Sequence, residues 1–236
     1  MLPALRHVDC WIFDLDNSLY PASCNLFELI DLRMGEFIQT LLGVDAVEAR
    51  RVQKAYFHEH GTTLAGLMAA DGVDPHEFLD FVHDIDMARL TADPAVVNSI
   101  DRLPGRKFVF TNGDETYARR VLERLGLANA FDGMHDIHAM GYVPKPNPQA
   151  YQAMCERHAI DPAAALFVED MARNLKPAKA LGMTTVWVDN GSEQASQGAD
   201  HSFIDYRTHD IGVWLTQILG EATLGDGDER RAAASH

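Results

Sequence analysis

The sequence has few cysteines, no long hydrophobic run and no recognisable leader segment. Its three cysteines, Cys10, Cys24 and Cys155, are an odd number without metal-ligand spacing, so we expect neither a disulfide framework nor a zinc site. No apolar run approaches the roughly 18 residues that a membrane-spanning helix needs. The first residues also lack the basic start and apolar stretch of a secretory signal. We therefore expect a globular cytoplasmic protein.

Positive charge is scarce as well. The chain has 20 Lys and Arg against 35 Asp and Glu, which gives a formal net charge of -15. Duplex DNA and anionic membranes both require a cationic protein surface, so we expect neither a nucleic-acid polymer nor a membrane as a partner. A small anionic substrate fits this composition if a cation or a few lysines reverse the local field. Both a monomer and a homodimer remain open.

The 236 residues favour one domain with a sizeable insertion. Short apolar runs without polar alternation predict buried parallel strands at 10–13, 108–110, 166–168 and 184–188. Helical stretches such as 114–125 separate the later strands. This alternation predicts an α/β fold with a doubly wound, Rossmann-like parallel sheet.

The insertion lies between the first two predicted strands and contains no convincing strand. Its apolar residues recur at helical spacing, first at Leu26, Ile30, Met34, Phe37 and Leu41, and again within 47–58, 63–70 and 75–85. We therefore predict an α-helical cap at 21–95 inserted into a core of 1–20 and 96–220. A lid is expected, because the insertion leaves at the carboxyl end of the first strand, where such sheets bind ligands. Residues 221–236 lack apolar periodicity and are predicted to be a flexible tail.

Four polar segments stand at or just after the ends of predicted strands. They are Asp14 to Ser18, Thr111-Asn112-Gly113, Lys145 to Pro148, and Glu169-Asp170 with Asn174 one turn later. Each segment alone is typical of a turn or helix cap, but their joint placement at one sheet edge favours a shared crevice. There Asp14, Asp170 and a backbone oxygen suit Mg²⁺. Asp14 is then positioned to form an aspartyl-phosphate, while Asp16 protonates the leaving oxygen and later activates water.

These four segments resemble the motifs of the haloacid dehalogenase-like hydrolase superfamily over roughly residues 8–190. The resemblance implies that Asp14 is the nucleophile, Asp16 the acid and base, and Asp170 the magnesium acid. It also implies a helical cap between the first two motifs. The expected site residues are Asp14, Asp16 and Lys145 for catalysis, Thr111, Asn112 and Lys145 for phosphate, Asp14, Asp16 and Asp170 for the Mg²⁺ cofactor, and Glu169 and Asn174 in support.

A narrower resemblance is to the pyrimidine 5'-nucleotidase branch. It rests on Asp16 to Pro21, Gly61 to Leu67, Phe81-Val82-His83 and Phe110 to Gly113. Ser18 replaces the more usual threonine and keeps a hydroxyl, while Gly113 replaces an alanine. The resemblance implies a nucleoside monophosphate as substrate. The cap residues expected to contact it are Tyr20, Tyr56, Thr62 and Thr63, and Phe27 and Phe57 are further aromatics for a planar ring.

Several other readings stay open. A phosphatase of small sugar phosphates or phosphoglycolate and a phosphomutase would use the same chemistry. A haloacid dehalogenase also uses an aspartate nucleophile, but Asp16 argues against it because halide displacement needs no acid on a leaving oxygen. The full set of acids argues against a non-enzymatic binding module. The segments 58–60 and 135–138 contain paired histidines without the spacing of a zinc hydrolase, and Trp11, Trp187 and Trp214 are expected in the core.

Overall fold

A computed structural model describes residues 1–220, in which a six-stranded parallel sheet forms the centre of the protein. The strands are β1 (Cys10–Phe13), β2 (Arg106–Phe110), β3 (Gly133–His135), β4 (Ala165–Glu169), β5 (Thr184–Val188) and β6 (Tyr206–Thr208). Their order is β3-β2-β1-β4-β5-β6, which is that of a doubly wound sheet. The predicted Rossmann-like α/β class is therefore confirmed. The predicted tail at 221–236 lies outside the described residues.

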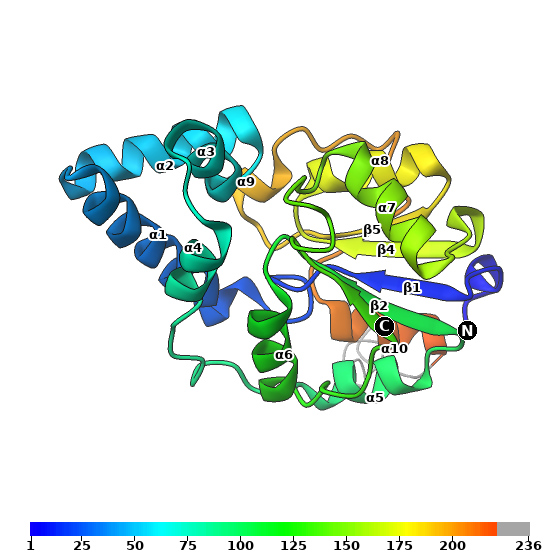
Figure 1. Cartoon of the computed structure of the whole chain (residues 1–236). Helices are drawn as coiled ribbons and strands as arrows, with labels where there is room; N and C mark the ends of the chain where they lie inside the picture. Colours follow the sequence, from blue (N-terminus) through cyan, green and yellow to red (C-terminus); the bar gives the residue numbers. More distant parts are fainter. Residues whose placement is uncertain (221–236) are drawn as a thin grey trace, which may run out of the picture.

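The four predicted strands are present, and their burial explains their sequence. Every residue of β1 and β4 is buried, because these strands have neighbours on both sides and helices over both faces (Figure 1). The edge strands β3 and β6 were not predicted. Each has only three residues and is partly exposed, so neither carries the apolar run that marked the others.

Helices cover both faces of the sheet. The core helices are α5 (Pro94–Arg102), α6 (Glu115–Arg124), α7 (Pro148–His158), α8 (Ala172–Leu181), α9 (Glu193–Ser196) and α10 (Ile211–Leu219), with 3₁₀ turns at Pro3–Leu5, Ala22–Cys24 and Pro162–Ala164. Helices α7 and α8 lie over one face, and α5 and α10 lie over the other (Figure 1). The side chains of Trp11, Trp187 and Trp214 are buried, as expected.

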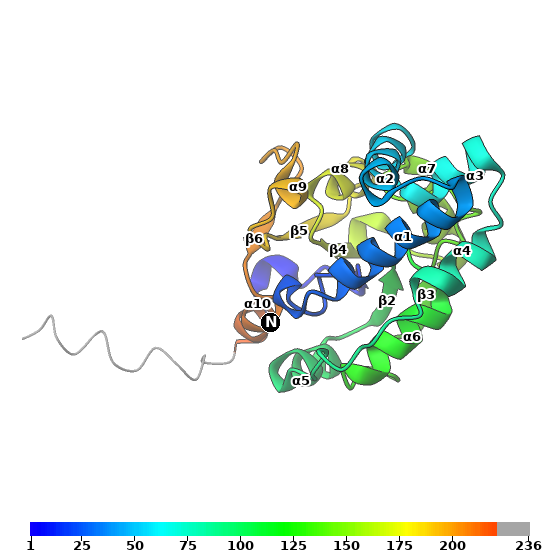
Figure 2. The same cartoon turned by 90° about the vertical axis from the view of Figure 1, so that its left-hand side faces the viewer.

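Four helices fill most of the chain between β1 and α5. They are α1 (Leu26–Leu42), α2 (Ala46–His60), α3 (Thr63–Asp71) and α4 (Pro75–Val82). Figures 1 and 2 show them together at the end of the sheet toward which the strands point. Phe37 of α1 contacts Phe78 and Phe81 of α4 edge-to-face, with ring centroids 5.1 and 5.5 Å apart. These contacts join the first and last of the four helices.

The last of these helices is shorter than predicted. The apolar pattern extends to Ile85, but α4 ends at Val82. The next residue, His83, caps the helix through its amide, which donates to the Leu79 carbonyl, and its Nδ1 pairs with the Asp114 carboxylate just before α6. A side-chain pair between residues 31 positions apart thus lies at the end of α4.

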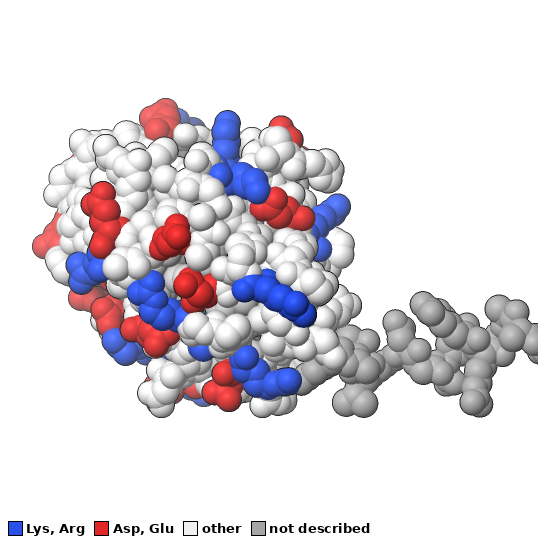
Figure 3. All heavy atoms as spheres, turned by 90° about the vertical axis from the view of Figure 1, so that its right-hand side faces the viewer, with Lys and Arg blue, Asp and Glu red and all other residues white. Residues whose placement is uncertain are grey.

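No helix in residues 1–220 combines the length and the hydropathy that crossing a membrane requires. On the face opposite the four helices, acidic and basic side chains are interspersed (Figure 3). The part of this face that residues 1–220 form shows no extended area of one charge.

Candidate functional site

The predicted site segments meet at the carboxyl edge of the sheet. Asp14 follows β1, Thr111 follows β2, and Asp170 follows β4. Lys145 comes from the loop after β3. All four residues line one cavity of ≈ 430 Å³ that also reaches helices α1 to α4. Because parallel strands end at the same edge, residues far apart in the sequence share one site.

Lys145 connects two of the acids. Its ammonium group donates to Asp14 Oδ1 at 2.7 Å, to Glu169 Oε2 at 2.8 Å and to the Phe110 carbonyl at 2.8 Å. The side chain is 1% exposed. Burial by itself would lower the pKa of Lys145, but Asp14 and Glu169 together raise it above its usual value. Lys145 is therefore a fixed cation inside the site.

Asn112 holds the backbone of Lys145 in place. Its Nδ2 donates to the Lys145 carbonyl at 3.2 Å, and its Oδ1 accepts from the Lys145 amide at 2.9 Å. The side chain predicted to bind phosphate is thus occupied by this paired contact. Next to it, Thr111 is buried, lines the cavity and accepts at Oγ1 from the Gly113 amide at 3.0 Å.

Three buried carboxylates share this corner of the cavity. Oxygen atoms of Asp14, Glu169 and Asp170 lie within 4.8 Å of one another. Burial, with the charge of Glu169, raises the pKa of Asp14 to about 7 and raises that of Asp170 as well. With Lys145 as the one ammonium among them, the fully ionised cluster has two negative charges in excess, three minus one.

This excess charge and the donor chemistry fit a hard divalent cation. Both oxygens of Glu169 are engaged, by Lys145 and by the Met171 amide. Asp14 is engaged at both oxygens as well, by Lys145 at 2.7 Å and by Ser18 at 2.8 Å, whereas Asp170 accepts one side-chain hydrogen bond, from Asn190 at 2.9 Å. Asp170 thus accepts the fewest hydrogen bonds of the three carboxylates, which makes it the best-suited cation ligand among them.

Asp16 stands apart from this cluster. Its Oδ1 accepts hydrogen bonds from Tyr20 and from Tyr117, each at 2.6 Å, and its side chain lines the cavity. Asp16 was predicted as a metal ligand together with Asp14 and Asp170, but the structure does not bring its carboxylate into the acidic cluster. Tyr117 was missed as a site residue because its spacing on α6 marks it as a core position. Its place one turn after the Thr111 segment was the available signal.

The two predicted tyrosines do not line the cavity. Tyr20 is buried and turned to Asp16. Tyr56 faces α3: a Cβ atom at Gly66 would lie 2.3 Å from the Tyr56 Cβ, and the Tyr56 hydroxyl donates to Asp71. The next residue, Phe57, lies about 100° further around α2 and does line the cavity.

The threonines at the start of α3 do reach the cavity. Thr62 and Thr63 both line it, and Thr62 caps α3 by accepting from the Ala65 amide at 3.1 Å. Next to them, Arg173 donates to the Gly61 carbonyl at 3.4 Å, and its guanidinium lies over the Phe57 ring, 4.5 Å from its centroid. Asn174, predicted in a supporting role, also lines the cavity and accepts at its carbonyl from the Tyr151 hydroxyl.

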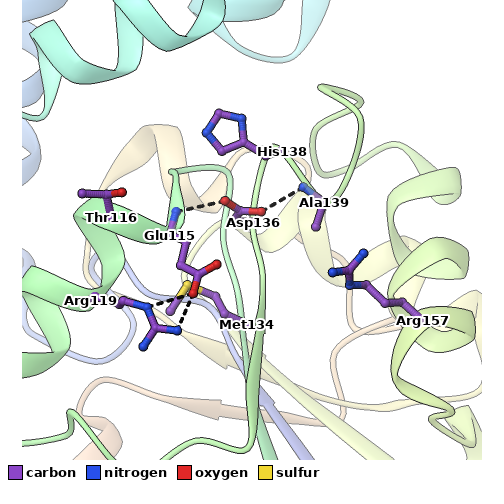
Figure 4. A pocket seen from close by; sticks show the side chains of 8 residues that line it. All are labelled: Glu115, Thr116, Arg119, Met134, Asp136, His138, Ala139 and Arg157. Atoms are coloured by element: carbon purple, nitrogen blue, oxygen red, sulfur yellow. Dashed lines mark hydrogen bonds and ion pairs between the residues drawn. The ribbon is translucent and has the colours of Figure 1, made fainter.

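A second hollow lies beside the start of α6 (Figure 4). Its lining is Glu115, Thr116, Arg119, Met134, Asp136, His138, Ala139 and Arg157. Arg119 pairs with Glu115, and Asp136 accepts from the amides of Glu115 and Ala139, each at 2.9 Å. Arg119 and Glu115 thus satisfy each other, backbone amides satisfy Asp136, and the predicted site residues Asp14, Thr111, Lys145 and Asp170 line the other cavity.

Several curated proteins are similar in sequence to this chain over part of its length. It is 26% identical over 189 residues to Phosphate metabolism protein 8 of Saccharomyces cerevisiae, covering 73% of this chain and 59% of that protein. It is 31% identical over 130 residues to Enolase-phosphatase E1 of Shewanella frigidimarina, covering 52% and 51%. The chain thus spans between half and three-fifths of these two relatives. It is 24% identical over 217 residues to Glyceraldehyde 3-phosphate phosphatase of Methanocaldococcus jannaschii, covering 85% and 92%.

Solved structures show the same fold. A HAD phosphatase from Thermococcus onnurineus superposes with a TM-score of 0.61 at 20% identity, over 90% of this chain and 98% of that one. L-2-haloacid dehalogenase from Xanthobacter autotrophicus gives 0.54 at 18% identity, over 91% and 100%. The family model described as haloacid dehalogenase-like hydrolase matches residues 8–182. The chain therefore belongs to the haloacid dehalogenase-like hydrolase family.

Proposed function

We propose that the protein hydrolyses phosphate monoesters of small metabolites through an aspartyl-phosphate at Asp14. The observation that carries this proposal is the buried contact of Lys145 with Asp14 and Glu169, beside Asp170 in the cavity that Asp16 also lines. Two of the relatives reported above are named phosphatases. Their names support the same class of reaction.

Mg²⁺ would be held by Asp14, Asp170 and a backbone oxygen. Bound there, it would offset the charge of the phosphate oxygens and of the carboxylates. Lys145 and the Thr111 hydroxyl would bind the phosphate. The Lys145 and Ser18 side chains each hold one oxygen of Asp14, and so orient the carboxylate that attacks phosphorus.

Proton transfer falls to Asp16. As the bond between phosphorus and the leaving oxygen breaks, the protonated Asp16 gives its proton to that oxygen. The carboxylate then takes a proton from the water whose oxygen attacks the aspartyl-phosphate. Phosphate is released, Asp14 regains its carboxylate, and Asp16 is again protonated. One side chain thus serves as acid and then as base.

For the substrate we propose a nucleoside monophosphate. Phe57 lies in the cavity wall with the Arg173 guanidinium 4.5 Å from its ring centroid, and Thr62 and Thr63 add hydroxyl groups. Aromatic stacking on a base contributes roughly 1–3 kcal/mol in nucleic-acid sites, which corresponds to about tenfold or more in affinity. A small sugar phosphate is a second candidate, because Glyceraldehyde 3-phosphate phosphatase is similar over 92% of its length.

Two other reactions have less support. A dehalogenase has no need of an acid, whereas Asp16 lines the cavity and is held by two tyrosine hydroxyls. A phosphomutase would return isomerised sugar phosphate in place of inorganic phosphate. Measuring both products from one sugar phosphate separates the mutase from the hydrolase.

The substrate is tested by kcat/KM for UMP, CMP, AMP, ribose 5-phosphate and p-nitrophenyl phosphate. We expect the nucleotides to exceed ribose 5-phosphate by about tenfold, and Phe57→Leu to remove most of that advantage. Phe81→Leu is the matched control, since Phe81 packs on Phe37 and does not line the cavity. Equal values for ribose 5-phosphate and the nucleotides would favour the sugar-phosphate candidate.

A further inference from the structure

Two tyrosine hydroxyls hold the same oxygen of Asp16. Tyr20 and Tyr117 both donate to Oδ1, each at 2.6 Å, and both tyrosines are at most 3% exposed. Among residues 1–220 no hydrogen bond reaches the other oxygen, Oδ2. One side of the carboxylate is therefore fixed, and the other is left for a molecule in the cavity that Asp16 lines.

Both hydroxyls act as donors. Burial, reinforced by the charge of Asp16, raises the pKa of Tyr20 and of Tyr117 well above the usual value. The two phenols therefore keep their protons at neutral pH. Both hydrogen bonds end on the same oxygen, so the pair restrains the rotation of the Asp16 side chain.

Tyr117 is itself in contact with the segment that follows α4. Its ring stacks on His83, with centroids 4.1 Å apart and planes 14° apart, and His83 pairs with Asp114. The Arg120 guanidinium donates to the His83 carbonyl at 2.9 Å. Asp114, Tyr117 and Arg120 recur every third residue, so one face at the start of α6 holds the segment after α4.

We propose that Tyr20 and Tyr117 are positioning residues that orient Asp16 so that Oδ2 carries the proton to the leaving oxygen. This inference rests on the proposed phosphatase function. The proton on Oδ2 passes to the leaving oxygen as its bond to phosphorus breaks, and the same oxygen later takes a proton from the attacking water. The tyrosines donate to Oδ1 throughout and exchange no proton with the substrate.

The test compares leaving groups. The p-nitrophenolate ion leaves readily without a proton, whereas an alkoxide needs one. We expect Tyr117→Phe to lower kcat/KM by about 10- to 100-fold for the alkyl phosphate that the wild type hydrolyses best, with the loss in kcat and not in KM. For p-nitrophenyl phosphate we expect a loss of less than about threefold. Tyr20→Phe should act in the same direction. Tyr142→Phe is the control, because its hydroxyl contacts His138 outside the cavity.

Equal losses for both esters would show that the tyrosines only support the fold, and unchanged kinetics would show that Asp16 needs neither; each result overturns the inference. If circular dichroism shows that Tyr117→Phe is misfolded, the test uses Tyr20→Phe instead, by comparing its loss in kcat/KM for the alkyl phosphate with its loss for p-nitrophenyl phosphate. Failure of the proposed function looks different. The wild type would then hydrolyse no ester, or Asp14→Asn would stay active, and both proposals would fall.

Discussion

The Nζ atom of Lys145 lies 2.7 Å from Oδ1 of Asp14, and both side chains are buried. Breaking a buried ion pair from one side leaves a charge without its partner, which costs about 3–5 kcal/mol. We expect Lys145→Met to lower the free energy of unfolding by about that amount and to abolish turnover. Adding Glu169→Gln should restore part of the stability and none of the activity. Urea titration of the single and double variants measures both effects, and full stability of Lys145→Met would contradict them.

Asp14→Asn is expected to reduce turnover by several orders of magnitude, because the amide is neither a nucleophile nor an anionic ligand. The same change removes one of three crowded carboxylates. The metal-free variant should therefore unfold at a higher temperature than the metal-free wild type. Asp71→Asn is the control, because Asp71 is an exposed acid on α3. Activity within about tenfold of the wild type would refute the assignment of Asp14.

Metal dependence can be followed without turnover. EDTA should silence the enzyme and Mg²⁺ should restore it, whereas Ca²⁺, with its longer bonds, should inhibit by drawing both oxygens of Asp14. A ligand at 100 times its Kd adds about 2.7 kcal/mol to the free energy of unfolding. Mg²⁺ should thus raise the Tm of the wild type and leave that of Asp170→Asn nearly unchanged. Equal Tm shifts in the two proteins would place the ion elsewhere.

His135 should make stability depend on pH. Its ring is fully buried and neither ring nitrogen has a partner among the described residues, and burial lowers the pKa of His135 to about 4. Between pH 6.5 and 4 the unfolded chain therefore binds more protons than the folded one, so stability falls as the pH falls through this window.

The matching variant is His135→Leu, which has no charge to bury. Its free energy of unfolding should change less than that of the wild type between pH 7 and pH 4.5. His201→Leu, at an exposed position, serves as the control. Parallel curves for the wild type and His135→Leu would show that other groups set the acid sensitivity.

The sequence predicted the parts of the fold that carry strong local patterns. Strands β1 and β4 are buried throughout, so their residues are apolar without interruption. Strands β3 and β6 form through pairing with longer neighbours, and their own three residues give no signal. The end of α4 was predicted too late. His83, just after this helix, pairs with Asp114, 31 residues later, and a contact over that distance leaves no local pattern in the sequence.

The site residues that follow strand ends could be predicted from the sequence. The residues whose orientation depends on how helices pack against one another could not. Asp14, Lys145, Glu169 and Asp170 meet because parallel strands place them at one edge. Whether Tyr56 or Phe57 faces the cavity depends on how α2 rotates against α3, and adjacent helical positions differ by about 100°. Sequence spacing alone does not fix that rotation.

The most direct test of the central claim is to identify the covalent intermediate. Enzyme quenched during turnover is reduced with borohydride, which converts an aspartyl-phosphate to homoserine, and the peptides are analysed by mass spectrometry. We predict homoserine at position 14 in the wild type, only when substrate is present, and none in Asp14→Asn. Homoserine at another aspartate, with turnover intact in Asp14→Asn, would contradict the account.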